Sequence, residues 1–179
     1  MRFFGIVITA LAIATSPVSA QDIDLTDLTR YEIIAEGEEA RTLSDVEALE
    51  DAYQQLINAG DCDAAIPAII EFYEAANIAS NLIRRGNEPY YDARREDQES
   101  VARNRTLLDE LISAERVFNT LLEQRNRAWV EEAKCLLETG ERGAAVTRLY
   151  RALDYISTDE RELWEEARRL LWAEVGFQP

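Results

Sequence analysis

The side chains that most often carry catalysis are scarce in this chain of 179 residues. It contains no histidine, which excludes Ser–His and Cys–His nucleophilic systems and the commonest zinc and haem ligands. The only lysine, Lys134, lies inside a predicted helix without the flanking motif of a Ser–Lys dyad. We therefore expect no catalytic residue, no resident cofactor and no metal site.

Carboxylates are the remaining candidates for acid–base chemistry. The pairs Glu131–Glu132 and Glu165–Glu166 are adjacent on predicted helices, so their side chains point in different directions. A glycosidase needs two carboxylates that face each other across a cleft. Residues 61–63, Asp-Cys-Asp, lack the further ligands and the glycine of a calcium loop and favour helix capping. There is no Gly-rich phosphate loop either, so a carboxylate-dependent envelope hydrolase is the least favoured alternative.

Residues 84–95, RRGNEPYYDARR, concentrate arginine and tyrosine around a predicted loop. Both residue types anchor protein interfaces, through planar bidentate hydrogen bonds and rigid amphipathic area. The candidate binding residues are Arg84, Arg85, Tyr90, Tyr91, Arg94 and Arg95. In the alternative interpretation, which we favour because charge runs are usually solvated, the arginines serve helix ends and local ion pairs and the tyrosines pack inward.

The charge balance restricts the class of partner. The chain has 35 acidic and 19 basic residues, a net charge of −16. Such a surface repels nucleic-acid phosphates and anionic lipid headgroups. We therefore expect no nucleic-acid partner. Oligomeric state is left open.

The N-terminus is typical of a secretory signal peptide, residues 1–20. Arg2 precedes the apolar run 3–14, and small residues at 18–20 suit cleavage between Ala20 and Gln21. Twelve apolar residues are too few to span a bilayer, which needs roughly twenty. The sequence therefore predicts a periplasmic or secreted protein with no membrane insertion after cleavage.

The mature chain divides into an acidic arm and one domain. Residues 21–41 are acidic and poorly periodic and are expected to be flexible, with only YEII (31–34) expected to dock. Whether this arm orders on binding is left open. Residues 42–179 suit a single domain. In an exported protein Cys62 and Cys135 favour a disulfide, whereas in the cytosol they would be buried thiols.

Apolar residues recur at helical spacing throughout this domain. A first helix is expected from a capping box at Ser44 and Glu47 as far as Gly60. A second begins at Asp61 or Asp63 and ends at Arg84–Arg85–Gly86, followed by a loop over 86–91.

Three further helices are expected in the second half of the domain. A long one covers about 98–138, continuous or kinked near Ser113, and Gly140 and Gly143 end it. The next runs to Ile156, and a capping box at Ser157 and Glu160 opens the last helix. Nothing alternates with period two, so the fold class is all-α.

Two similar stretches mark a repeated turn, AGDCDAAI (59–66) and TGERGAAV (139–146). Each joins two amphipathic helices through a glycine turn, which is the αα-hairpin of helical repeat proteins. On these residues the chain resembles the tetratricopeptide repeat (TPR) family. The matching positions are Gly60, Ala65, Ile69, Trp129, Ala133, Leu136, Gly140, Ala145, Leu149 and Ala152.

Other positions depart from the TPR pattern. Glu132 replaces a large apolar residue and Ser157 the common proline, while Tyr53 and Phe72 are bulky where the family is small. The 80-residue spacing of the two turns also differs from the family period of about 34 residues.

The resemblance implies antiparallel hairpins stacked as a short right-handed solenoid or bundle with one long helix. A generic antiparallel bundle is the alternative. Successive first helices of such repeats run parallel, which would bring Cys62 and Cys135 together. The resemblance also implies a non-enzymatic adaptor or scaffold for a protein or peptide partner in the cell envelope. An oligomeric assembly accessory acting through helix 98–138 is the runner-up. Trp164 and Trp172 either cover the open end of the stack, which we favour, or dock a partner.

Overall fold

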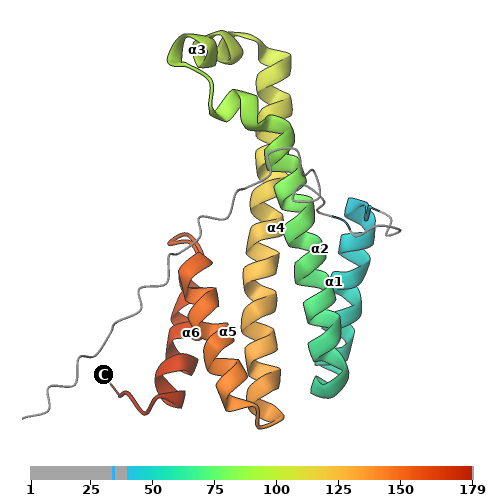
Figure 1. Ribbon diagram of the computed structural model, residues 1–179, viewed down its shortest axis with the longest axis vertical. Coiled ribbons are helices and arrows are strands. Elements are labelled where there is room, and N and C mark those ends of the chain that lie inside the picture. The colour runs from blue at the N-terminus through green and yellow to red at the C-terminus, as the bar shows by residue number, and fades with distance from the viewer. Residues whose placement is uncertain (1–33, 35–39, 179) are drawn as a thin grey trace, which may run out of the picture. The chain divides into compact units, whose positions relative to one another are not determined.

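A computed structural model describes Ile34 and residues 40–178 (Figure 1). These residues contain helices and no strand, which confirms the all-α class. The helices are α1 (Leu43–Asn58), α2 (Cys62–Tyr91), α3 (Arg95–Arg103), α4 (Arg105–Glu138), α5 (Arg142–Tyr155) and α6 (Arg161–Glu174). The predicted signal peptide and nearly all of the acidic arm lie outside the described residues. Residues 40–178 belong to one compact unit.

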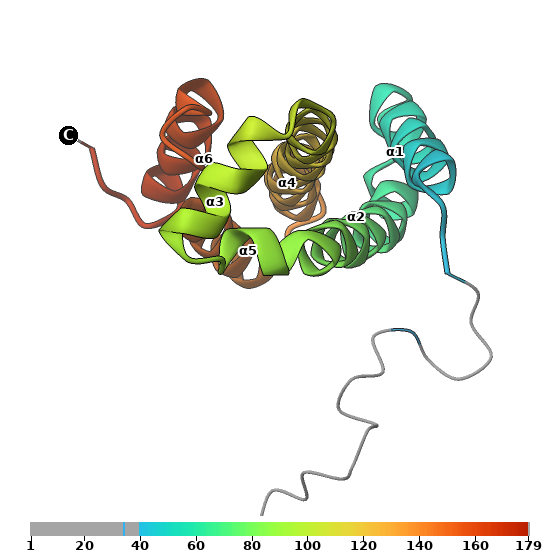
Figure 2. The same cartoon turned by 90° about the horizontal axis from the view of Figure 1, so that it is seen from above.

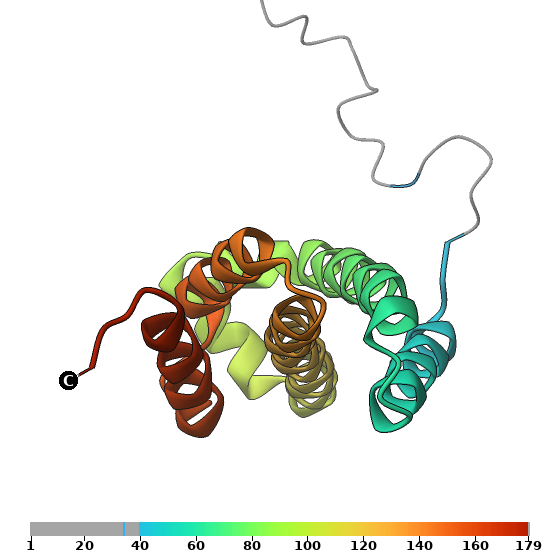
Figure 3. The same cartoon turned by 90° about the horizontal axis from the view of Figure 1, so that it is seen from below.

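The helices of this unit form two layers. Helix α2 packs between α1 and α4, and α5 packs between α4 and α6. Seen along the helix axes, α1, α4 and α6 lie in one layer and α2 and α5 in the other (Figures 2 and 3). The α2–α4 pair extends past the other helices and carries α3 at its end (Figure 1).

The repeated turn has one backbone geometry in both copies. Gly60 and Gly140 have φ of +73° and +87°, a conformation that favours glycine. After Gly60 the Asp61 N–H donates to Leu56 O (3.1 Å), and after Gly140 the Glu141 N–H donates to Leu136 O (2.7 Å). These are Schellman motifs, which satisfy carbonyls at the helix end. The turn recurs because the chain reverses direction in the same way twice, from α1 into α2 and from α4 into α5.

Two predicted helix starts are wrong in detail. Thr42, and not Ser44, caps α1, and Asp45 completes the capping box by accepting from Thr42 N at 2.7 Å. Ser44 already lies inside the first turn. Before α6 the N-cap is Glu160, whose carboxylate accepts from Ser157 N while Ser157 Oγ accepts from Asp159 N. Only half of the second predicted box therefore forms.

The predicted loop over 86–91 is wrong, because α2 continues through it to Tyr91. Gly86 adopts no positive φ. An Arg85–Glu88 ion pair and a bond from Asn87 Nδ2 to Ile83 O (2.8 Å) support this part of the helix. Pro89 removes one backbone donor. The packing of α2 along α4 outweighs the helix-breaking tendency of Gly86 and Pro89, since tertiary contacts supply most helix stability.

The predicted long helix 98–138 is also wrong, because it is broken at Asn104 and not near Ser113. Asn104 has an extended backbone (φ −90°, ψ 95°), and its side chain accepts from Leu107 N at 3.3 Å. The asparagine side chain accepts a hydrogen bond from a backbone N–H of the first turn that would otherwise have no partner. A new helix, α4, can therefore start after Asn104. Gly143 lies inside α5 and does not break it.

The core consists of two adjoining clusters. One gathers around Tyr53 and Phe72 between α1, α2 and α4. The other gathers around Trp129 and Leu149 between α4, α5 and α6, and Tyr73 packs against both. The small residues of the TPR-like pattern are fully buried between helices: Ala65, Ala133, Ala145 and Ala152. An alanine there lets two helix backbones approach closely.

Candidate functional site

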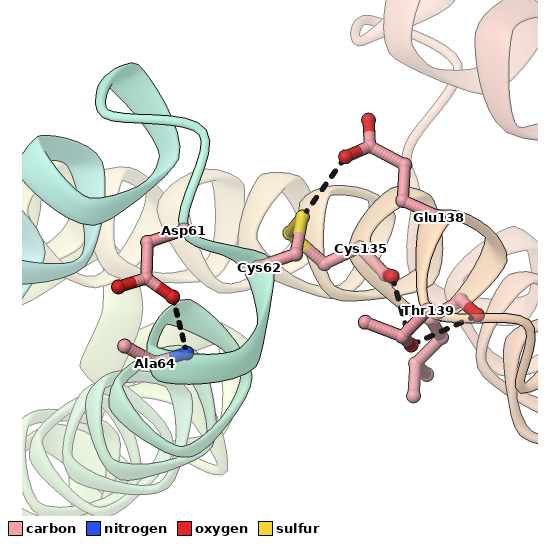
Figure 4. Close-up of a disulfide and its surroundings, with 7 residues drawn as sticks. Asp61, Cys62, Ala64, Cys135, Glu138 and Thr139 are labelled. Carbon is pink, nitrogen blue, oxygen red and sulfur yellow. Dashed lines mark hydrogen bonds between the residues drawn. A yellow bond between two sulfur atoms is a disulfide. The ribbon is translucent and has the colours of Figure 1, made fainter.

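The two cysteines link α2 to α4 within the first core cluster. Cys62 is the first residue of α2 and Cys135 lies in the last turns of α4. Their Cα atoms are 5.0 Å apart and their sulfurs lie at bonding distance, as the sequence predicts (Figure 4). A Glu138 carboxylate oxygen lies 3.3 Å from Cys62 Sγ, a packing contact because a disulfide sulfur has no hydrogen to donate.

The arginine and tyrosine residues of 84–95 are spread over the end of α2 and the start of α3. Arg85 pairs with Glu88, and Arg95 with Glu99 at 3.7 Å. Arg94 is the N-cap of α3, and Tyr90 is half-buried. Arg84 and Tyr91 line a pocket of about 180 Å³ that Glu115 and Phe118 of α4 complete. The structure therefore does not bring the six residues together as one site.

A buried ion pair lies between α4 and α5. Glu132, only 3% exposed, accepts a hydrogen bond from Arg148 Nη2 on Oε1 at 2.9 Å, and its Oε2 lies 2.6 Å from Arg148 Nε. Arg148 also donates to Tyr73 Oη of α2 at 3.1 Å and stacks on its ring. Burial raises the pKa of Glu132, and Arg148 opposes that rise. The sequence marked Glu132 as a departure from the TPR pattern, and Arg148 is the partner that sequence reasoning missed.

A second buried cation, Arg125, stacks on the ring of Trp129. Arg125 lies 4.5 Å from the Trp129 ring centroid and donates to Asn77 Oδ1 and Asn126 Oδ1, both at 3.0 Å. Asn126 in turn donates to Glu160 Oε2 at 3.0 Å. This network connects α2, α4 and the segment before α6. Arg125 Nε and Trp129 Nε1 are buried without a hydrogen-bond partner among the described residues, but the amide and carboxylate groups of the network bond to one another, which favours a structural role.

A pocket on the layer of α1 and α4 was not foreseen from the sequence. We call it the α1–α4 groove, a cavity of about 220 Å³. Its apolar lining is Leu43 and Val46 from α1, Phe72 from α2, and Val117 and Leu121 from α4. Phe72, Val46 and Leu121 belong to the core, whereas Leu43 is 44% exposed. The groove therefore gives a partner side chain access to the apolar core.

The rim of this groove carries an excess of negative charge on its α1 side. Glu47 and Glu50 line it, with Arg116 opposite. Gln124 Nε2 of α4 donates to Glu50 Oε2 at 2.6 Å. Burial raises the pKa of Glu50, and the neighbouring Asp51 raises it further. A cation arriving at the rim would relieve this unfavourable cluster.

The same layer continues from α4 to α6 through an ionic contact. Lys134 Nζ lies 2.6 Å from Glu166 and 2.9 Å from Glu131. Burial lowers the pKa of Lys134, but the hydrogen bonds to Glu166 and Glu131 outweigh it, so the net shift is upward. The lone lysine is thus engaged by two carboxylates.

No family model matches the chain, and neither a curated protein nor a solved structure matches it. The part of the chain that the structure describes has no group of three or more acidic, Cys or His side chains placed to hold a metal ion. Among those residues, no helix is long and apolar enough to cross a membrane. The functional interpretation therefore rests on the geometry.

Proposed function

We propose that the protein is an exported, TPR-like interaction module that binds a peptide segment of a protein partner in the α1–α4 groove. The observation that carries the proposal is the apolar groove, floored by Phe72 and open at Leu43, on the layer formed by α1, α4 and α6. Binding is the proposed activity, because the groove offers shape, apolar area and charge to a partner side chain.

The TPR-like arrangement is supported by two hairpins that share one turn geometry. Helices α1 and α2 form the first hairpin and α4 and α5 the second. The buried residues Trp129, Ala133 and Ala145 stand at the positions that the TPR pattern requires. In a right-handed stack of such units the first helices line one face, which is where the groove lies.

Export is supported by two independent features. The first twenty residues suit a cleavable signal peptide. Cys62 and Cys135 are placed for a disulfide, which persists outside the cytosol. We therefore place the module in the periplasm or outside the cell.

The groove also indicates the chemistry of its occupant. Its floor and walls accept one aliphatic or aromatic side chain, since the cavity is small and apolar. Glu47 and Glu50 at the rim favour a lysine or arginine beside that side chain. The preferred ligand is an apolar residue flanked by a basic one. We prefer this groove to residues 84–95, because Arg85 and Arg95 already pair with carboxylates of their own helices.

Selection from a random peptide library on the oxidised mature chain tests the proposal. The expected peptides combine a large apolar residue with lysine or arginine. Leu43→Asp should weaken their binding by about tenfold or more, equivalent to about 1.4 kcal/mol. Leu82→Asp is the matched control, because Leu82 is similarly exposed (42%, against 44% for Leu43) but lies on α2 away from the groove. Failure to select any such peptide, or equal binding by both variants, would contradict the proposal.

A further inference from the structure

In the layer of α1, α4 and α6, the two outer helices are α1 and α6, and they expose different residue types to solvent. On α1 the residues turned away from the core are polar, including Asp51, Gln54 and Gln55. Helix α6 packs inward through Leu163 and Ala167. On its other side it carries Trp172, followed by Val175 (61% exposed) and Phe177 (51% exposed). Helical stacks need a polar outer face at each end. The exposed charged residues of α6 meet that need, whereas Trp172 and the two residues after the helix add apolar area beside them.

An arginine is stacked between two tryptophan rings on this side of α6. The Arg168 guanidinium lies 4.3 Å from the Trp164 ring centroid and 4.6 Å from that of Trp172. Phe177 packs edge-on against Trp172, with ring centroids 4.9 Å apart. Stacking between two rings leaves the N–H edge of the guanidinium as its remaining binding surface. Stacked arginine is therefore preorganised to meet a carboxylate.

The charges on the same side of α6 are of both signs. Glu165 pairs with Arg161 at 2.9 Å, and Glu166 pairs with Lys134 at 2.6 Å. In the described part of the chain, Glu162, Arg168 and Arg169 have no ion-pair partner. These three residues line one open hollow of about 680 Å³ together with Trp172 and Phe177. We call this surface the α6 outer face.

Unpaired groups of both signs on one surface suit a two-fold contact between identical chains, in which each patch meets its own copy. Arg168 and Arg169 of one copy can then meet Glu162 of the other, while Trp172 and Phe177 supply buried apolar area. The net charge of −16 opposes any approach between two copies, and opposite charges that meet across the contact offset that repulsion locally. We infer that the α6 outer face is a self-association surface, and that its occupant is a second copy of this chain. This inference is independent of the peptide groove.

Sedimentation equilibrium of the oxidised mature chain over a wide concentration range tests the inference. The expected result is a concentration-dependent rise from the monomer mass to twice that mass. Arg169→Glu and Glu162→Arg should each raise the dimer dissociation constant by about tenfold, and their combination should restore association. Trp172→Ala should also weaken the dimer. Arg103→Glu on α3 changes the net charge by the same amount as Arg169→Glu, far from α6, and should leave the dimer intact (Figure 1).

Circular dichroism of each variant separates lost association from lost folding, and the exposed position of Arg169 makes its variant the safest test. A monomer at every concentration would overturn the inference. So would a dimer that Arg169→Glu and Trp172→Ala leave unchanged, because that contact would lie elsewhere. Weakening by both single charge reversals without recovery in the double variant would overturn the pairing of Arg169 with Glu162.

Discussion

Cys62 at the start of α2 and Cys135 near the end of α4 lie with their Cα atoms only 5.0 Å apart, although 73 residues separate them in the chain. The bond joins the turn after α1 to the end of the first helix in the second hairpin. It therefore fixes the relative position of the two hairpins, at the end of the molecule opposite α3 (Figure 1). The groove between α1 and α4 depends on that relative position.

Reduction of this disulfide is expected to destabilise the fold. A cross-link closing a loop of this length stabilises by about 4 kcal/mol in the chain-entropy model. Urea denaturation with and without reductant measures the loss. The Cys62→Ser/Cys135→Ser variant should match the reduced protein and be insensitive to reductant. Equal unfolding midpoints in both redox states would contradict the prediction.

Alanine substitutions distinguish a glycine that forms a turn, Gly60, from Gly86, where the sequence predicted a loop. Gly60→Ala should destabilise by about 1–2 kcal/mol, because φ is +73° and a Cβ is disfavoured there. Gly86→Ala should stabilise by about 0.5–1 kcal/mol, because Gly86 lies inside α2 and no neighbouring atom lies within 4 Å of the added Cβ. Chemical denaturation measures both. A destabilised Gly86→Ala would show that residues 86–91 form a loop after all.

The buried ion pair of Glu132 and Arg148 should behave as one unit. Arg148→Met leaves the Glu132 carboxylate buried without a cation and should cost about 3–5 kcal/mol. Adding Glu132→Leu should recover most of that loss, since an apolar pair of similar volume replaces the charges. A double-mutant cycle in urea measures the coupling. Additive effects of the two substitutions would refute it.

The groove carboxylate Glu50 provides a pH test. Its pKa is raised by burial and by Asp51, so its charged form disfavours the folded state. Glu50→Gln should therefore stabilise the protein relative to wild type at pH 7. The gain should shrink as pH falls through the raised folded pKa and vanish below the unfolded value near 4.5. Denaturation at a series of pH values measures this difference, and a gain that grew toward acid pH would have the wrong sign.

The helices that the sequence predicted best are those whose ends carry strong local signals. Gly60 and Gly140 are followed by new helices because only glycine readily adopts positive φ, and that requirement is visible in the sequence. Gly86 and Pro89 are also residue types that commonly end a helix, but both lie inside α2. There the packing against α4 decides, and packing between distant segments is not visible in local sequence.

The candidate site was predictable only in part. The cysteine pairing was expected because the chain carries a predicted export signal, and the TPR resemblance implied parallel first helices that bring Cys135 to the level of Cys62. The groove was not predictable, since Leu43, Phe72 and Val117 come from three helices and each resembles an ordinary core residue. The ion pair of Arg148 was not predicted for a similar reason, because its partner Glu132 lies on another helix.

The central claim is that a partner binds in the α1–α4 groove, and methyl NMR of the mature chain with a library-selected peptide tests it most directly. The account predicts that peptide addition shifts the methyl signals of Leu43, Val46, Val117 and Leu121 and that Leu43→Asp abolishes those shifts. Leu82 signals near the far end of α2 should stay unchanged. Shifts confined to residues around Arg84 and Tyr91, or to α6, would contradict the account.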